Sequence, residues 1–362
     1  MKITLPTSPI ANHLENPRWP VLIAGPCSAE SEEQLLDTAR QLKASQRISY
    51  FRAGVWKPRT RPGSFEGMGE VALRWLQTVK AETGLPTAVE VATAEHAELA
   101  LKHGVDVLWV GARSSANPFS VQEIADSLRG TDVVVLVKNP VNPDLQLWVG
   151  ALERIHRAGI TKLAAIHRGF SAYEQSVYRN EPVWNMAIEL KTICPTLPII
   201  CDPSHISGRR SLVPLVAQKA LDLNMDGLMI EVHCDPSVAK SDAEQQLLPA
   251  DYAQLIFALQ LREVTSSKPE LRNELDSYRQ QIDLLDDTIF ETLSKRMAMS
   301  QKIGQYKKDN NLMVLQLNRW EDILEQRSRL AAAMGLSSEF AKRLLVLVHE
   351  ESINLQTEIM NS

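Results

Sequence analysis

Residues 21–262 alternate eight times between a short apolar run and a longer amphipathic stretch, and this repeat constrains the fold more than any other feature. The apolar runs predict strands at 21–24, 48–56, 87–91, 106–110, 133–137, 163–166, 197–201 and 227–230. The stretches after them have helical spacing and predict helices at 31–44, 68–84, 95–104, 120–128, 145–159, 183–193, 210–223 and 249–262. Near-continuous apolar runs are typical of parallel strands that are buried on both faces. Eight such units predict an α/β fold of the (β/α)8 TIM-barrel type.

Polar side chains follow the predicted strands at the points where the strands end. They are Cys27, Lys57, Arg113, Lys138, Arg168, His205 and Glu231. Because the carboxyl ends of the strands surround one mouth of a barrel, these side chains are expected to meet there. The cations of the set, with Arg52 added, need anions to offset their mutual repulsion. We therefore expect a substrate with about two strongly anionic groups.

Weaker interpretations exist for single members of this set. The stretch 51–60, FRAGVWKPRT, places Arg52, Lys57 and Arg59 close together and could by itself be a solvated basic loop. Lys138 by itself could be a Schiff-base lysine or an ion-pair partner. The recurrence of cations after several strands favours a shared anion-binding site.

Four side chains of metal-ligand type are predicted to converge at the same mouth. Cys27, His205 and Glu231 follow the first, seventh and eighth strands, which are neighbours in a closed barrel, and Asp242 lies in the next loop. A thiolate, an imidazole and two carboxylates together suit a divalent first-row metal ion. Such an ion could polarise a carbonyl oxygen. Each residue alone could instead be a structural buried side chain.

The composition argues against several other classes of protein. With a net charge of −5, the chain has no bulk attraction to nucleic acid or to a membrane surface. No apolar run approaches the about 18 residues of a membrane span, and the N-terminal stretch lacks the apolar core of a signal peptide. The four cysteines have neither zinc-site nor disulfide-framework spacing. We expect a cytoplasmic protein with reduced thiols and with no nucleic-acid or membrane partner.

Eight motifs in order resemble the type I-beta group of 3-deoxy-D-arabino-heptulosonate 7-phosphate (DAHP) synthases over about residues 18–262: GPCSAES, RAGVWKPRT, GARS, VKNP, IHRGF, CDPSHISGRRSLV, IEVH and KSDAEQ. The resemblance implies condensation of phosphoenolpyruvate with erythrose 4-phosphate, the first step of the shikimate pathway to aromatic amino acids. It implies one divalent metal ion per barrel, with Mn, Fe, Co or Zn as possibilities, bound by Cys27, His205, Glu231 and Asp242. It assigns phosphoenolpyruvate to Arg52, Lys57, Arg113, Lys138 and Arg168, and erythrose 4-phosphate to Pro58, Arg59 and Thr60.

The motif KPRT separates this resemblance from one to a sister family. The 3-deoxy-D-manno-octulosonate 8-phosphate synthases share the barrel but have an asparagine at the position of Pro58, so Pro58 favours the four-carbon sugar phosphate. Two positions depart from the family pattern. Ala53 replaces a second glycine, and Arg61 follows KPRT where a serine is usual.

After Arg262 the pattern changes to continuous helical spacing. The polar segment 263–269 predicts a linker between a barrel domain, 1–262, and an all-α domain, 270–362. Apolar residues at steps of three and four predict one very long helix at 270–308, followed by helices at 318–334 and 337–360. A domain of this size cannot cover such a helix alone, so we expect a homodimer formed through the helical domain.

Cations and amides recur along the predicted helices. Arg279 and Arg296 lie about 25 Å apart along one helix. They can therefore share a small ligand only if antiparallel pairing brings Arg279 of one subunit to Arg296 of the other. Lys307 lies three turns after Arg296, and Ser352 and Gln356 share one helix face. A plain dimerisation arm is the alternative interpretation.

The segments YRQQIDLLDDTIFETLSKRM, IGQYKKDNN, LQLNRW and EESINLQ resemble the all-helical, intertwined-dimer chorismate mutases over about residues 270–360. The resemblance implies rearrangement of chorismate to prephenate without a cofactor. It assigns substrate binding and catalysis to Arg279 of the partner subunit, Arg296, Lys307, Arg319, Ser352 and Gln356. Trp320 stands where several relatives place a glutamate that contacts the substrate hydroxyl. The alternative is that the helical domain is mainly a ligand-sensing dimerisation module with weak mutase activity.

Together the two resemblances imply a bifunctional enzyme, a transferase joined to an isomerase. The barrel is predicted to begin near Val21 after a short tail, which leaves no room for the N-terminal sensor domain that many relatives carry. We therefore expect allosteric feedback in which prephenate, bound in the mutase site, inhibits the condensation.

Overall fold

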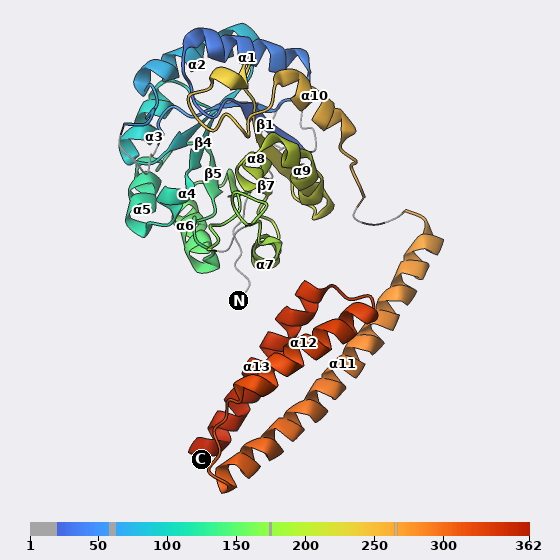
Figure 1. Cartoon of the computed structure of the whole chain (residues 1–362). Helices are drawn as coiled ribbons and strands as arrows, with labels where there is room; N and C mark the ends of the chain where they lie inside the picture. Colours follow the sequence, from blue (N-terminus) through green and yellow to red (C-terminus); the bar gives the residue numbers. More distant parts are fainter. Residues whose placement is uncertain (1–19, 58–62, 174–175, 264, 266) are drawn as a thin grey trace. The chain divides into compact units, whose positions relative to one another are not determined.

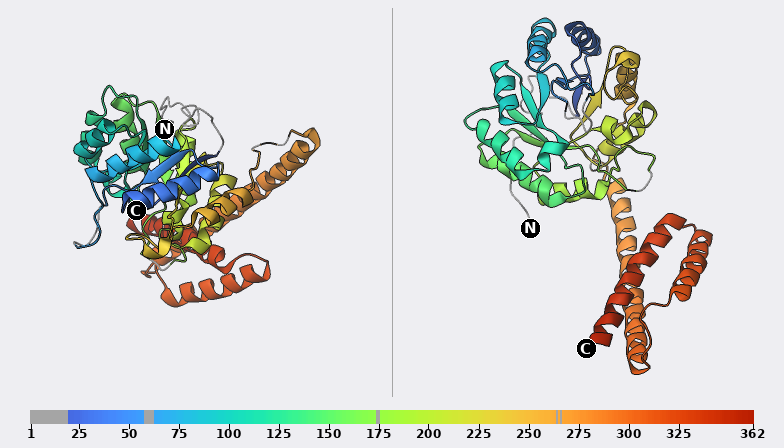
Figure 2. Two further views of the ribbon diagram at one scale, coloured as in Figure 1. Left: turned by 90° about the horizontal axis from the view of Figure 1, so that it is seen from above. Right: turned by 60° about the vertical axis from the view of Figure 1, so that its left-hand side comes forward.

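The computed structural model describes residues 20–57, 63–173, 176–263, 265 and 267–362. Eight parallel strands close into a barrel in sequence order, and the helices that connect them surround it (Figures 1 and 2). The strands are β1 Val21–Gly25, β2 Tyr50–Ala53, β3 Thr87–Val91, β4 Val107–Val110, β5 Val134–Lys138, β6 Leu163–His167, β7 Ile199–Cys201 and β8 Gly227–Glu231. The predicted (β/α)8 barrel is confirmed.

The helices around the barrel begin at residues suited to helix starts. Ser31 and Thr93, for example, accept hydrogen bonds from backbone N–H groups in the first turns of α1 and α3. The helices are α1 Glu32–Ala44, α2 Glu70–Thr83, α3 Ala94–Lys102, α4 Ala112–Ser115, α5 Pro118–Ser127, α6 Leu145–Arg157, α7 Trp184–Ile193, α8 Pro203–Ser207, α9 Val213–Asp222 and α10 Pro249–Ala258. Two short helices, α4 and α8, were not predicted from the sequence; they follow β4 and β7 closely and carry Arg113 and His205.

Side chains inside the barrel change from apolar to charged toward the carboxyl ends of the strands. Alternate residues of a strand point to the same face, and an apolar cluster fills the lower interior: Val21, Ile23, Tyr50, Ala88, Val107, Trp109, Val134, Leu136, Ala164, Ile166, Ile200 and Met229. Two residues further along their strands, on the same face, are Arg52, Glu90, Lys138 and Glu231. Charged groups therefore gather at one mouth, above a closed apolar interior.

Trp109 joins the apolar interior to the charged mouth. Its side chain is fully buried, and its Nε1 donates a hydrogen bond to Glu90 Oε2 at 2.8 Å. The Arg52 Cζ and Lys138 Nζ atoms lie 5.0 and 5.8 Å from a ring centroid of the indole. One aromatic side chain thus fills the barrel and supports two cations by cation–π contact.

The second strand is shorter than the sequence predicts. It ends at Ala53 rather than at Trp56. The chain leaves the sheet at Gly54, which approaches the end of β1 so closely that a Cβ there would lie 2.2 Å from the backbone oxygen of Cys27. Lys57 therefore reaches the mouth from a loop, and the prediction that it ends a strand was wrong.

The chain divides into two compact units, Met1–Val264 and Thr265–Ser362. The second unit is all-α and consists of α11 Pro269–Asp309, α12 Leu317–Ala333 and α13 Ser338–Asn361. Helix α13 packs along both α11 and α12 (Figure 2). With 41 residues, α11 is about 60 Å long, which confirms the very long helix. The boundaries expected from the sequence, with a barrel domain at 1–262, a linker at 263–269 and a helical domain at 270–362, stay predictions.

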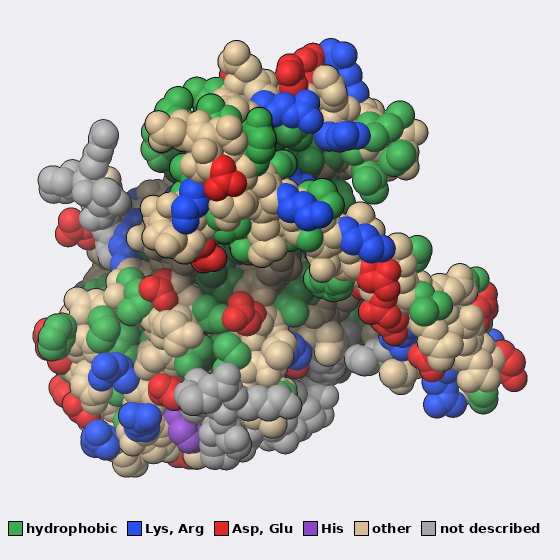
Figure 3. Space-filling model, turned by 90° about the horizontal axis from the view of Figure 1, so that it is seen from below, with side chains coloured by type: hydrophobic (Ala, Val, Ile, Leu, Met, Phe, Trp, Pro, Cys, Tyr) green, Lys and Arg blue, Asp and Glu red, His purple; other side chains and the backbone are tan. Residues whose placement is uncertain are grey.

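Helix α11 carries a stripe of large apolar side chains that nothing in the described part of the single chain covers fully. About half of the surface of each side chain is exposed. The stripe is formed by Leu271, Leu275, Tyr278, Ile282, Leu285 and Ile289. These residues recur at steps of three and four, and the buried residues of α11 among those described all lie near its C-terminal end. Hydrophobic side chains also stand among charged ones on the molecular face in Figure 3. No described helix is long and apolar enough to cross a membrane.

Replacing Trp109 by alanine should lower the free energy of unfolding by about 3–5 kcal/mol, because it opens a cavity in the barrel interior. Trp109→Phe keeps a ring and should cost less. Urea unfolding followed by circular dichroism measures both changes. A Trp109→Ala protein as stable as the parent would show that the indole does not support the interior.

Candidate functional site

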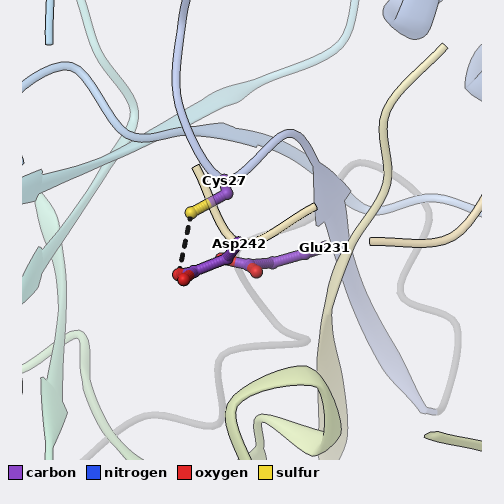
Figure 4. Close-up of side chains that lie close together, drawn as sticks. All are labelled: Cys27, Glu231 and Asp242. Atoms are coloured by element: carbon purple, nitrogen blue, oxygen red, sulfur yellow. Dashed lines mark hydrogen bonds between the residues drawn. The ribbon is translucent and has the colours of Figure 1, made fainter. Parts of the chain in front are cut away.

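Three side chains that can ligate a metal meet at the charged mouth of the barrel. Cys27 follows β1, Glu231 ends β8, and Asp242 lies in the loop after β8. Their ligand atoms all lie within 4.8 Å of one another (Figure 4). The Cys27 thiol donates a hydrogen bond to Asp242 Oδ2 at 3.3 Å. The fold thus brings together three of the four residues that the sequence suggests as metal ligands.

The fourth, His205, lies beside this group rather than within it. Its Nε2 is 3.8 Å from Glu231 Oε1, and its Nδ1 is 2.8 Å from Asp202 Oδ2. Because a carboxylate accepts hydrogen bonds, Asp202 favours a proton on Nδ1 and leaves Nε2 as the nitrogen that can ligate a metal. Asp202 also accepts a hydrogen bond from Lys138 Nζ at 2.9 Å.

Neighbouring side chains hold the ligand-type groups in place. Gln246 Oε1 accepts the backbone N–H of Cys27 at 2.9 Å, and Gln245 Nε2 donates to Glu231 Oε2 at 2.6 Å. Lys57 Nζ lies 3.0 Å from both the backbone oxygen and the Sγ of Cys27. Such contacts orient ligands before a metal binds.

The surroundings set different protonation states for these groups. Burial, with the charge of Glu231 added, raises the pKa of the Cys27 thiol to about 12. A metal ion would therefore have to displace its proton. Burial acts to raise the pKa of Asp242, but His205 and Arg179 outweigh it and hold that pKa below its usual range. One thiol, two carboxylates and an adjacent imidazole fit a divalent first-row ion.

Arg52 is the most deeply buried of the predicted anion-binding cations. Its side chain is 1% exposed, and its Nη2 lies 3.1 Å from Glu231 Oε1. Its Nε and Nη1 atoms are buried and have no hydrogen-bond partner among the described residues. Leaving a buried donor unsatisfied is unfavourable. These two N–H groups are therefore available to an anionic ligand.

Arg168 is another of the predicted anion-binding cations, and an asparagine holds its guanidinium. Its Nη1 donates to Asn180 Oδ1 at 2.8 Å. Burial first, and then repulsion from Arg179 and Arg113, lowers the pKa of Arg168, although Asp202 acts to raise it. Arg168 thus belongs to a set of mutually repelling guanidinium groups. Such a cluster favours a bound anion. Pro58, Arg59 and Thr60, predicted to contact the sugar phosphate, lie outside the described residues, as does Arg61.

Three charged residues of the site were not assigned by the sequence analysis: Glu90, Asp202 and Arg179. Burial acts to raise the pKa of Glu90, but Lys138 and Lys57 outweigh it and lower that pKa. Glu90 could have been found from the inward-facing alternation of its strand, and Asp202 from its place directly after one. No sequence signal singles out Arg179, which donates hydrogen bonds to the Asp242 carboxylate and to a neighbouring glutamine.

In the helical unit, Arg296 and Lys307 of α11 face two residues of α13. Arg296 Nη1 donates to Ser352 Oγ and, at 3.2 Å, to the backbone oxygen of Val348. Lys307 Nζ donates to Gln356 Oε1 at 3.0 Å. Lys307, Ser352 and Gln356 are buried. The α11–α13 interface therefore holds two cations, one after the other along α11, and a polar side chain of α13 fixes each of them.

Arg279 and Arg319 are placed differently from these pairs. Arg279 forms an ion pair with Asp276 at 2.9 Å and its side chain is 64% exposed. Arg319 lies in the first turn of α12, beside Trp320. The Trp320 ring stacks on His349 with centroids 3.9 Å apart and planes 7° from parallel. The place of His349 in this stack could not be predicted from the sequence, because a contact between helices leaves no periodic signal.

Comparison with known proteins relates the two units to two enzyme families. The DAHP synthetase I family matches residues 16–267, and chorismate mutase type II matches residues 278–357. A curated phospho-2-dehydro-3-deoxyheptonate aldolase of Thermotoga maritima is 32% identical over 226 residues, 62% of this chain. The match spans 64% of that relative, less than two thirds of its length.

Other relatives extend the comparison. A 2-dehydro-3-deoxyphosphooctonate aldolase of Laribacter hongkongensis is 30% identical over 275 residues, 68% of this chain and 93% of the relative. A crystal structure of a T. maritima DAHP synthase has a TM-score of 0.60 at 29% identity and covers 66% of this chain and 67% of that one. A truncated form of a T. maritima 3-deoxy-D-arabino-heptulosonate 7-phosphate synthase has a TM-score of 0.57 at 25% identity and covers 71% and 87%.

The protein should bind cobalt(II) with a thiolate-to-metal charge-transfer absorption in the near ultraviolet, because Cys27 can supply the thiolate. Binding should be tighter at higher pH, since the metal must displace a thiol proton whose pKa is raised to about 12. Cys27→Ala should lose the absorption, whereas Cys201→Ala, which removes a buried thiol of β7, should keep it. An unchanged absorption in Cys27→Ala would locate the thiolate elsewhere.

Proposed function

The chain belongs to the DAHP synthetase I family and continues into a chorismate mutase type II region, and on this premise we propose that it is a bifunctional enzyme. The barrel condenses phosphoenolpyruvate with erythrose 4-phosphate to DAHP, and the helical unit rearranges chorismate to prephenate. The meeting of a thiol–carboxylate group with buried cations at one mouth is the observation that carries the barrel activity. A cytoplasmic location is part of the proposal, since none of the four cysteines is in a disulfide.

Phosphoenolpyruvate carries a carboxylate and a phosphate, and both need cationic partners. The proposed partners are Arg52, Lys57, Arg113, Lys138 and Arg168. The two unsatisfied N–H groups of Arg52 support a fork-shaped contact with one anionic group. Lys138 is held by Asp202 and by the face of Trp109, so its ammonium is fixed before substrate arrives. Cations placed in advance also stabilise the charge that develops as the enol carbon attacks the aldehyde.

Cys27, His205, Glu231 and Asp242 are the proposed ligands of one divalent ion, with Mn, Fe, Co or Zn as candidates. When bound, the ion would supply a Lewis acid for the aldehyde of the sugar phosphate. The protein's own contribution is orientation. Asp202 keeps Nε2 of His205 available, and Gln245 fixes the second oxygen of Glu231.

The sugar phosphate is a separate part of the proposal, because relatives named for both a heptonate and an octonate product match the chain. Phosphoenolpyruvate supplies three carbons, so a seven-carbon product needs a four-carbon aldehyde and an eight-carbon product needs a five-carbon one. Pro58 within KPRT supports the four-carbon aldehyde. Arg59 and Thr60 are the proposed partners of its phosphate.

Chorismate carries two carboxylates and an ether bond that breaks in the rearrangement. The residues proposed to form its pocket are Arg279 of the partner subunit, Arg296, Lys307, Arg319, Ser352 and Gln356. Arg296, fixed by Ser352, can bind a carboxylate, while Lys307 and Gln356 can together meet the ether oxygen as charge develops on it. The reaction is intramolecular, so positioned charges suffice and no cofactor is required.

A homodimer through the helical unit is the proposed assembly. Burial of the exposed apolar stripe of α11 against a partner would be favourable. Arg279 lies on the same exposed part of the helix. Antiparallel pairing of two α11 helices would bury the stripe and bring Arg279 into the partner's pocket.

Trp320 favours a second candidate function for the helical unit. An indole cannot replace the carboxylate that several relatives place there, so the unit could serve mainly to sense a ligand and to dimerise. The fixed pairs of Arg296 and Lys307 favour catalysis. Turnover of chorismate by the purified protein decides between the two.

Separate assays test the barrel activity. Condensation should have a kcat/KM at least about 10-fold higher with erythrose 4-phosphate than with a five-carbon aldose phosphate. Chelation and Cys27→Ala should each abolish condensation and leave the rearrangement intact, because the metal-ligand group found among the described residues lies in the barrel. Cys27→Ala enzyme that condenses at near the parent rate with metal present would refute the ligand assignment.

Mixing mutants tests the shared pocket. Arg279→Ala and Arg296→Ala should each lack mutase activity. Unfolding and refolding them together should restore activity, because a heterodimer has one site with both lesions and one intact site. Refolding each mutant alone is the control. Absence of recovery in a mixture that does form heterodimers would contradict a pocket built from two subunits.

Feedback control is also part of the proposal. Prephenate should fit the pocket that forms it, and if its binding changes how the helical unit meets the barrel, binding at the two sites is coupled reciprocally. Couplings of about 1–3 kcal/mol are typical. Prephenate is therefore the proposed inhibitor of the condensation.

The regulatory test compares three proteins. Prephenate, rather than tyrosine or phenylalanine alone, should inhibit condensation by the intact chain, and Arg296→Ala should relieve that inhibition. A protein that ends at Arg262 should be insensitive if it folds. Equal inhibition of all three proteins would locate the effector in the barrel. No inhibition of the intact chain would contradict the proposal.

A further inference from the structure

His349 presents a shielded ring nitrogen next to the proposed mutase pocket. It lies on α13 three residues before Ser352 and seven before Gln356, so the three side chains share one helix face. The His349 Nε2 atom is buried and has no hydrogen-bond partner in the described part of the chain. Because buried polar atoms are normally paired, a ligand in the pocket is the natural partner for this nitrogen.

Burial and nearby positive charge favour the neutral form of His349, and the two other neutral polar side chains of the pocket, Ser352 and Gln356, already pair with Arg296 and Lys307. Burial first, and then the positive charges of Arg296 and Lys307, lowers the pKa of His349. A neutral imidazole has one donor and one acceptor nitrogen, so it can pair with a hydroxyl in either direction. In the proposed reaction the cations suit the carboxylates and the ether oxygen. The hydroxyl of chorismate is then the polar group that still needs a partner.

Trp320 fixes the plane of this imidazole. The two rings lie 3.9 Å apart and are nearly parallel, with one ring on α12 and the other on α13. Such a stack restricts rotation of the imidazole and holds Nε2 in one direction. The indole itself offers one donor and no acceptor. Trp320 is therefore suited to position His349.

We propose that His349 hydrogen-bonds the hydroxyl of chorismate through Nε2 and that Trp320 is the positioning residue for this contact. The inference rests on the proposed mutase function and deepens it. Recognition of the hydroxyl then comes from an imidazole of α13 that is held by an aromatic ring of α12, and no carboxylate on α12 is required.

Kinetics with two substrates test the contact. His349→Leu should lower kcat/KM for chorismate by about 5- to 20-fold, the loss expected for one hydrogen bond. For an analogue of chorismate that lacks the hydroxyl, the same change should alter kcat/KM by less than about twofold. His349→Asn keeps a polar group and should recover part of the loss. Trp320→Phe keeps a stacking ring and should fall between the parent and His349→Leu.

The controls separate a specific contact from a general effect. His103→Leu removes a histidine of the barrel unit and should leave mutase kinetics unchanged. If His349→Leu does not fold, His349→Asn and Trp320→Ala serve in its place. For each of them the loss of kcat/KM with chorismate is compared with the loss with the analogue that lacks the hydroxyl. Equal losses with both substrates, or no loss with chorismate, would overturn the inference. A parent protein that does not convert chorismate at all would overturn the proposed mutase function, and the inference would fall with it.

Discussion

The buried ion pair between Arg52 and Glu231 is the interaction on which the barrel site depends. Its two side chains are 1% and 0% exposed and lie 3.1 Å apart. Arg52 is the penultimate residue of β2 and Glu231 is the last residue of β8, and these two strands flank β1. Between them β1 ends in Gly25, where a Cβ would lie 2.2 Å from the backbone oxygen of Arg52. A glycine at the end of β1 therefore allows the neighbouring strands to approach and their charges to meet.

A buried pair of this kind is weak support for stability by itself, because desolvation opposes the attraction. Binding of a ligand explains the charged groups around this pair better than a contribution to stability does. Among the described residues, the acidic groups at the mouth include Glu90, Asp202, Glu231 and Asp242. The cations there include Arg52, Lys57, Arg113, Lys138, Arg168 and Arg179. These groups partly neutralise one another, yet Arg52 keeps unsatisfied donors and a thiol stands beside the carboxylates. A divalent cation on the acidic side and an anion on the basic side would complete the balance.

Much of this arrangement could be predicted from the sequence, since it follows from periodicity. Apolar runs locate the barrel strands, and steps of three and four locate α11 and the shared face of Ser352 and Gln356. The structure differs from the prediction where a close contact, rather than a periodic sequence pattern, determines the element. The early end of β2 depends on how Gly54 meets Cys27, and the one-turn helix α8 that carries His205 is too short to leave a pattern. The stack that holds His349 depends on how two helices pack.

The central claim is that the buried cations at the barrel mouth form an anion site. Isothermal titration calorimetry of phosphoenolpyruvate with the metal-loaded protein tests it most directly. The parent should bind one molecule per chain, and Arg52→Gln should weaken binding by about 10- to 100-fold, the value expected for losing hydrogen bonds from a charged group. A melting curve must show that the variant is folded. Unchanged affinity in folded Arg52→Gln protein would contradict the account.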